Sequence, residues 1–194
     1  FPTVSMSDPD FSRGMWRGPV WINLAYGSIQ GLNRYGFENE ASELAFRLCD
    51  GVYRVFNDER KFYEFYDPTA HHTRDLDRKK GNRWKALTLG TGPQKSFVGW
   101  TGLVNTLVVE HLFGYRVADG KHRVEPRFPR QAVGKAYSLR IPRSSLAIDV
   151  AILDPDRFRL SLRGTDNKFL EREVGFGEAV EFWDSKEGLK GNAI

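Results

Sequence analysis

The spacing of apolar residues changes partway along the chain, and this change constrains the fold more than any other feature. Up to about residue 113, apolar side chains recur every three or four positions, which is the period of a helix with one buried face. After about residue 125 they recur at every second position, as in strands such as 146–150 and 158–162. The sequence therefore predicts helices first and antiparallel strands second, segregated into two layers or domains.

Three amphipathic helices are expected in the first part. The first covers residues 19–36, and the second has its apolar stripe over residues 41–56 with Asn39 as its N-cap. The joint between them is short, so we expect an antiparallel hairpin. The third covers residues 99–114. Three such helices make a poor closed core, because each must bury its stripe against a partner. Either the strands cover these helices or more helices lie upstream, and we favour the second.

A segment with no clear period, residues 57–98, separates the second and third helices. Structureless stretches of this length are often functional or disordered. Its second half holds a basic run made of Arg74, Arg78, Lys79, Lys80, Arg83 and Lys85. A solvated insertion is the favoured interpretation, and a lid that prefers an anionic substrate is an alternative. Only Trp84 interleaves the run, whereas a platform for stacking nucleic-acid bases needs more aromatic residues.

Composition narrows the functional class. Hydrophobic residues make up 40% and charged residues 28% of the chain, as in ordinary globular proteins. The net charge of +4 comes from charges of mixed sign, so we expect no nucleic-acid partner. The single cysteine, Cys49, excludes an intramolecular disulfide and zinc-ligand spacing. No apolar run reaches the ~18 residues of a membrane span. We expect no membrane partner and a cytoplasmic location.

Three short motifs resemble, in family order, those of glycoside hydrolase family 63, which includes processing α-glucosidases and mannosylglycerate hydrolases. Residues 15–21, Met-Trp-Arg-Gly-Pro-Val-Trp, resemble the motif that opens one barrel helix. Residues 64–68, Glu-Phe-Tyr-Asp-Pro, resemble a Glu-x-Tyr-(Asp/Asn)-Pro motif whose glutamate is the catalytic base. Residues 99–101, Gly-Trp-Thr, resemble the motif that opens the final barrel helix.

The resemblance implies a mainly α fold. On this basis residues 1–114 form the C-terminal portion of an (α/α)₆ toroid of helical hairpins, which is the catalytic barrel. Residues 115–194 form a smaller, antiparallel β-rich segment. The expected partner is the missing N-terminal half of the barrel, supplied by the same chain or by a separate one.

The resemblance also implies an inverting glycoside hydrolase, with α-linked glucosides or glycosides such as mannosylglycerate or glucosylglycerate as carbohydrate substrates. Inverting hydrolysis uses one carboxylic acid to protonate the leaving oxygen and one carboxylate to activate water. Glu64 takes the second role. Its aromatic neighbours provide an apolar setting that favours a base, unless a cation or hydrogen-bond donors oppose it. Water and two carboxyl groups suffice, so no cofactor and no metal are expected.

The resemblance implies that a further set of residues binds the sugar: Trp16, Arg17, Gly18, Trp21, Asn23, Tyr66 and Trp100. For several of these residues a purely structural role stays open as an alternative. Trp21 also fits a core position, Arg17 could pair with an acid, and Asn23 could satisfy a neighbouring backbone group. Asp67, which precedes a proline, could simply shape a turn.

The general acid of the family, an aspartate from the first half of the barrel, has no counterpart in this sequence. Three explanations stay open. The chain is a fragment of a longer enzyme, or it pairs with a second polypeptide, or it is a noncatalytic relative that binds carbohydrate. The first residue, Phe1, favours the fragment.

Overall fold

A computed structural model describes residues 2–78, 83–142, 145–164, 169–185 and 188–193. The chain divides into two compact units between Thr106 and Leu107. We call them the N-terminal and C-terminal units. The division falls inside the third predicted helix, residues 99–114. None of the helices in the described ranges is long and apolar enough to cross a membrane.

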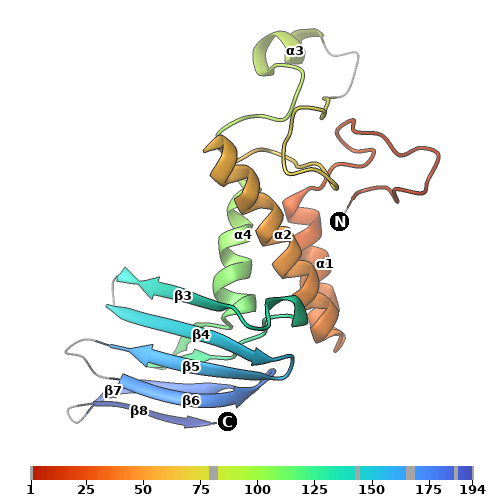
Figure 1. The fold of residues 1–194 in the computed structure, drawn as a ribbon. Helices are drawn as coiled ribbons and strands as arrows, with labels where there is room; N and C mark the ends of the chain where they lie inside the picture. Colours follow the sequence, from red (N-terminus) through yellow and green to blue (C-terminus); the bar gives the residue numbers. More distant parts are fainter. Residues whose placement is uncertain (1, 79–82, 143–144, 165–168, 186–187, 194) are drawn as a thin grey trace. The chain divides into compact units, whose positions relative to one another are not determined.

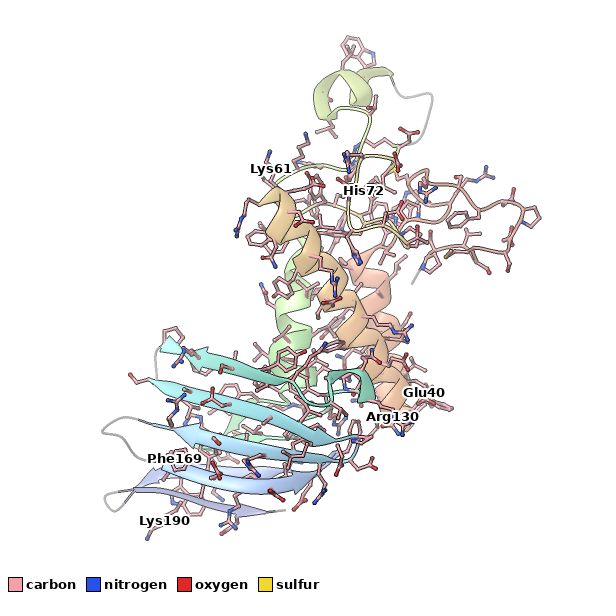
Figure 2. All side chains as sticks on the ribbon, viewed as in Figure 1. Glu40, Lys61, His72, Arg130, Phe169 and Lys190 are labelled. Carbon is pink, nitrogen blue, oxygen red and sulfur yellow. The ribbon has the colours of Figure 1, made fainter. Side chains whose placement is uncertain are left out.

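The N-terminal unit is built on an antiparallel helical hairpin, as predicted. Helix α1 (Ile22–Arg34) and helix α2 (Glu38–Glu59) are joined by a short turn. The chain runs down α1 and back up α2 (Figure 1), and Figure 2 labels Glu40 near one end of α2 and Lys61 beyond the other. The prediction of Asn39 as the N-cap is wrong, because α2 begins at Glu38 and Asn39 lies in its first turn.

The third predicted helix is a continuous helical run with three hydrogen-bonding patterns. It consists of the 3₁₀ turn η1 (Trp100–Gly102), helix α4 (Leu103–Thr106) and the π-helical turn η2 (Leu107–Leu112), the last of which belongs to the C-terminal unit. A short helix, α3 (Arg83–Leu89), lies inside the segment for which the sequence showed no period. A helix of about two turns is too short to display a clear helical stripe.

The prediction of a mainly α fold that is part of an (α/α)₆ toroid is wrong. The described residues form the four α-helices named above and two four-stranded antiparallel sheets, so strands contribute about as much as helices. Only α1 and α2 form a long helical hairpin, and the described residues contain no repetition of such hairpins around a ring. The helical period of the first part identified its helices correctly but carried no information about closure.

The C-terminal unit contains the antiparallel strands that the alternating pattern predicted (Figure 1). One sheet has the order β1-β2-β7-β8, made of β1 (Arg116–Ala118), β2 (Lys121–Val124), β7 (Val180–Ser185) and β8 (Gly188–Ala193). The other has the order β3-β4-β5-β6, made of β3 (Ala136–Ile141), β4 (Leu146–Asp154), β5 (Arg157–Arg163) and β6 (Phe169–Gly175). A 3₁₀ turn, η3 (Arg130–Ala132), precedes β3.

The core of the C-terminal unit follows the pleat of strands β4 and β5. Ile148 pairs with Leu162 and Val150 pairs with Leu160, and all four side chains are buried. Burying one such side chain stabilises a fold by roughly 1.5–3 kcal/mol. The intervening residues, such as Ser161, lie on the opposite face and are more exposed. The period of two in the sequence therefore reports one buried sheet face.

Gly114, in the C-terminal unit, has a φ of +61°, and a Cβ there would lie 2.1 Å from the backbone oxygen of Glu125. Gly134 is the matched control, because its φ is +77° but a Cβ would meet no atom within 4 Å. We expect Gly134→Ala to lower the free energy of unfolding by about 1 kcal/mol. Gly114→Ala should lower it by about 1–3 kcal/mol more, because the backbone must also move. Urea titrations followed by circular dichroism measure both, and equal losses would contradict the close approach.

Candidate functional site

Backbone hydrogen bonds bring the first two sequence motifs together in the N-terminal unit. The N–H groups of Val20 and Tyr66 donate to each other's carbonyl oxygens at 2.8 and 3.0 Å. The amide of Met15 donates to the oxygen of Asp77 at 2.7 Å. The loop before α1 is therefore attached along its length to the segment that carries Glu64.

The third motif holds the backbone of the second. The indole Nε1 of Trp100 donates to the carbonyl oxygen of Glu64 at 2.8 Å. The hydroxyl of Thr101 donates to the carbonyl oxygen of Tyr63 at 2.6 Å, and Thr101 is fully buried. The amide of Glu64 donates to the oxygen of Gln94 at 3.1 Å. Two adjacent side chains of the Gly-Trp-Thr motif thus fix two consecutive peptide units of the glutamate motif.

The side chain of Glu64 is buried beside a cation. Glu64 is 7% exposed, and its Oε2 accepts a charge-assisted hydrogen bond from Nη2 of Arg78. The amide of Gln94 approaches the same oxygen at 3.4 Å. The aromatic neighbours expected around Glu64 are therefore accompanied by a cation and a hydrogen-bond donor, the exception that the sequence analysis allowed. The solvated interpretation of the basic run is wrong for Arg78, whose side chain is 10% exposed.

Four aromatic residues from the three motifs form one cluster, in which some rings are stacked and one is tilted. The rings of Trp16 and Trp21 are nearly parallel, with centroids 3.6 Å apart. Trp21 also packs against Phe65 at 5.1 Å and against Trp100 at 5.5 Å. Trp21 is 1% exposed and its Nε1 donates to the oxygen of Met15, which agrees with the core alternative. Trp16, at 50% exposed, is the outermost ring of the stack.

A cavity of about 720 Å³ lies beside this cluster. Its lining residues are Ser12, Arg13, Gly14, Met15, Trp16, Arg17, Asp77 and Arg78. Two predicted sugar contacts, Trp16 and Arg17, are therefore in its wall. Glu64 does not line it, but Arg78 both lines the cavity and bonds Glu64, so one side chain connects the two.

Two further residues of the first motif have contacts within their own loop. A Cβ on Gly18 would lie 2.3 Å from the backbone oxygen of Ser12, so glycine is required for the loop to pack on itself. Arg17 is exposed and lies 3.8 Å from the exposed carboxylate of Asp10, as the acid-pairing alternative expected. Such exposed pairs contribute little to stability, so Arg17 is available to a ligand.

Asn23 and Tyr66 lie away from the lining of this cavity. Asn23 is on α1, and its buried Oδ1 has no partner among the described residues. The hydroxyl of Tyr66 accepts a hydrogen bond from the amide of Tyr63 at 3.0 Å. Burial raises the pKa of Tyr66 to about 12, so the phenol stays protonated at neutral pH. Tyr66 therefore supports the glutamate segment from inside the unit.

Sequence reasoning missed the role of Arg13. Its Nε donates to Oδ2 of Asp67 at 2.7 Å, which ties the N-terminal loop to the turn after Glu64. The amides of Thr69 and Ala70 donate to Oδ1 of Asp67, so this residue shapes the turn as one alternative proposed. No signal in the sequence pairs Arg13 with a residue so far along the chain. The described residues contain no group of three or more His, Cys, Asp or Glu side chains placed to hold a metal ion.

Comparisons with known proteins agree with the resemblance that the motifs carry. Residues 1–82 match the model of the mannosylglycerate hydrolase MGH1-like glycoside hydrolase domain. The match covers 82 of the 194 residues of the chain. The family 63-like resemblance seen in the three motifs is thereby confirmed.

Three individual relatives are named as mannosylglycerate hydrolases or as a mannosyl-oligosaccharide glucosidase. The chain is 46% identical over 55 residues to a mannosylglycerate hydrolase of Rubrobacter radiotolerans, covering 28% of this chain and 11% of that protein. It is 36% identical over 86 residues to a mannosylglycerate hydrolase of Thermus thermophilus, covering 44% and 19%. It is 30% identical over 125 residues to a probable mannosyl-oligosaccharide glucosidase of Schizosaccharomyces pombe, covering 56% and 13%.

The glycoside hydrolase similarity thus concerns a small part of each relative, since the matched regions span between 11% and 19% of the relatives' own length. The search of solved structures gives no significant match.

The hydrogen bond from Thr101 to Tyr63 can be tested by Thr101→Val, which keeps the side-chain shape and removes the donor. A buried carbonyl then loses its partner, so the free energy of unfolding should fall by about 1–3 kcal/mol. Thr88→Val is the matched control, because the Thr88 hydroxyl bonds the Trp84 oxygen at an exposed position. Its effect should stay within about 0.5 kcal/mol. Urea unfolding followed by tryptophan fluorescence measures both, and equal effects would refute the anchoring role.

The Arg13–Asp67 contact predicts a pH dependence of stability. Burial by itself raises the pKa of Asp67, but hydrogen bonds from Thr69, Arg13 and Ala70 outweigh it, so the pKa lies below the ordinary value of 3.8. A carboxyl group whose pKa is lowered by folding stabilises the folded state above its unfolded pKa. This contribution is lost as the pH falls below 3.8 and through the folded pKa.

Asp67→Asn should therefore reduce the free energy of unfolding at pH 7 by about 1–3 kcal/mol. The gap to the unmodified protein should close as the pH falls below 3.8. Asp10→Asn is the control, because Asp10 faces Arg17 across 3.8 Å of exposed surface and should matter by less than about 1 kcal/mol. A gap for Asp67→Asn that persists unchanged at acidic pH would contradict the charged contact.

Proposed function

We propose that this chain carries the general base and part of the sugar subsite of an inverting glycoside hydrolase. The observation that supports it most strongly is the convergence of three separate motifs on one buried glutamate, Glu64. The match of residues 1–82 to a glycoside hydrolase domain supports it as well. We infer that Glu64 removes a proton from the water that attacks the anomeric carbon.

The second carboxyl group comes from outside these 194 residues in our proposal. An inverting enzyme needs a carboxylic acid roughly 6.5–9.5 Å from the base, with the substrate and one water between them. No aspartate in this sequence matches the family's acid. We propose that a further polypeptide segment, in the same chain or in a separate one, supplies it.

The sugar itself contacts the wall of the 720 Å³ cavity in this proposal. That volume lies within the range of about 300–1,000 Å³ that is common for small-molecule sites. Half-exposed Trp16 offers an aromatic face to the apolar side of a pyranose ring, and Arg17 offers donors to hydroxyl or carboxylate oxygens. Trp21 and Trp100 support this wall from inside, and Tyr66 supports the segment that carries Glu64. Contacts of Gly18 and Asn23 with the sugar remain predictions.

For the substrate we propose an α-linked glucoside or a glycoside such as mannosylglycerate or glucosylglycerate. The names of the relatives, a mannosylglycerate hydrolase and a mannosyl-oligosaccharide glucosidase, support this range. A noncatalytic carbohydrate-binding role is the second candidate. It is favoured by one observation: Glu64 is paired with Arg78 and does not line the cavity.

Glu64→Gln separates these two candidates. In the natural protein at its full length, the variant should lower kcat for the best substrate by about 100-fold or more, because the general base is lost. Sugar affinity, measured by calorimetry, should change little, because the neutral amide fills the same space as the carboxylate. Glu40→Gln, which changes an exposed carboxylate on α2, is the control and should leave kcat unchanged. Turnover of the Glu64 variant close to that of the unmodified protein would exclude the catalytic proposal and leave the binding role.

A further inference from the structure

We propose that Arg78 is a positioning residue for Glu64: it holds one carboxylate oxygen, Oε2, so that the other, Oε1, faces the attacking water. This inference rests on the proposed role of Glu64 as the general base. It concerns a residue of the basic run that sequence reasoning placed in a solvated insertion.

Arg78 is itself fixed before it reaches Glu64. Its backbone amide donates to the oxygen of Thr91 at 2.6 Å, and its Nε donates to the oxygen of Gly92 at 3.1 Å. Its Nη2 then pairs with Oε2 of Glu64. A guanidinium is planar, so fixing Nε also fixes the direction of Nη2. The carboxylate therefore meets a donor whose position is set by two backbone contacts.

Contacts on Glu64 are distributed unevenly between its two oxygens. Arg78 and the amide of Gln94 both approach Oε2, and no donor among the described residues bonds Oε1. At its other end the residue is held by Trp100, which donates to its carbonyl oxygen. A general base works only when the accepting oxygen lies within hydrogen-bond reach of its proton donor. This arrangement leaves one oxygen of Glu64 for that purpose.

Arg78 differs in exposure from Arg74, another cation of the basic run. The side chain of Arg78 is 10% exposed and bonded, whereas Arg74 is exposed. A buried guanidinium needs a partner, because transferring an unpaired charge out of water is strongly unfavourable. Arg78 also lines the 720 Å³ cavity, so it lies between the proposed subsite and the base.

The test compares Arg78→Met and Arg78→Lys with Arg74→Met, an exposed control from the same run, in the natural protein at its full length. Misplacing a reacting group by about 1 Å can lower a rate about 100-fold. We expect kcat of Arg78→Met to fall between about 10-fold and 100-fold with little change in KM. Arg78→Lys should recover part of the loss, because it restores the charge but not the planar fork. Arg74→Met should behave like the unmodified protein.

Two readouts separate positioning from general damage to the fold. Millimolar guanidinium ion should restore part of kcat in Arg78→Met, and it should not do so in Glu64→Gln. In a background of Glu64→Gln, adding Arg78→Met should cause no further loss, because the two residues act as one unit. Arg78→Met should lower the midpoint temperature of thermal unfolding, because it leaves a buried carboxylate unpaired. The double variant contains no such carboxylate, so its midpoint should return most of the way to that of the unmodified protein.

The outcomes distinguish this inference from the proposed function. Normal or increased kcat in Arg78→Met, with loss of activity in Glu64→Gln, overturns the role of Arg78 alone. A fall in kcat that guanidinium does not reverse, and that adds fully to Glu64→Gln, also overturns it. If Arg78→Met does not fold, Arg78→Lys decides, and an unaltered kcat there overturns the inference. Full activity in Glu64→Gln would instead remove the proposed function itself.

Discussion

A carboxylate as buried as that of Glu64 needs compensation, and the N-terminal unit is arranged to provide it. Ionised groups are costly to remove from water unless they are paired and hydrogen-bonded. Arg78 supplies the pairing charge, and the loop residues Thr91 and Gly92 hold Arg78 in place. Asp77, the neighbour of Arg78 in the sequence, exchanges backbone hydrogen bonds with Met15 and Arg13 of the loop before α1, so this loop is bonded next to the pair.

Next to Glu64 in the sequence, Phe65 begins a series of aromatic rings whose exposure increases outward. Phe65 is fully buried, Trp21 covers it, and Trp16 stacks on Trp21 with half of its surface exposed. Trp100 packs against Trp21 and also donates to the backbone of Glu64. The cluster thus connects Trp16, in the wall of the cavity, to the backbone of the proposed base.

Local features of the fold could be predicted from the sequence, and global ones could not. The α1–α2 hairpin and strands such as β4 and β5 follow from the period of apolar residues, which reports one buried face at a time. Closure into a toroid depends on which helix faces pack together. The period of apolar residues carries no information about that packing, and the predicted toroid was wrong. In the site, the residues singled out by the family resemblance include Trp100 and Glu64, which the structure joins by a hydrogen bond from the indole to the carbonyl oxygen of Glu64. Partners such as Arg78 were missed, because a basic run looks the same whether one member is buried or all are solvated.

The stereochemistry of the product tests the central claim most directly. An α-linked substrate can be followed by proton NMR during hydrolysis by the natural protein at its full length. If Glu64 activates water as a general base, the first product is the β-anomer, because a single displacement inverts the anomeric carbon. First release of the α-anomer would mean that the configuration is retained through a covalent intermediate. That result would contradict the role of Glu64 as the general base of an inverting enzyme.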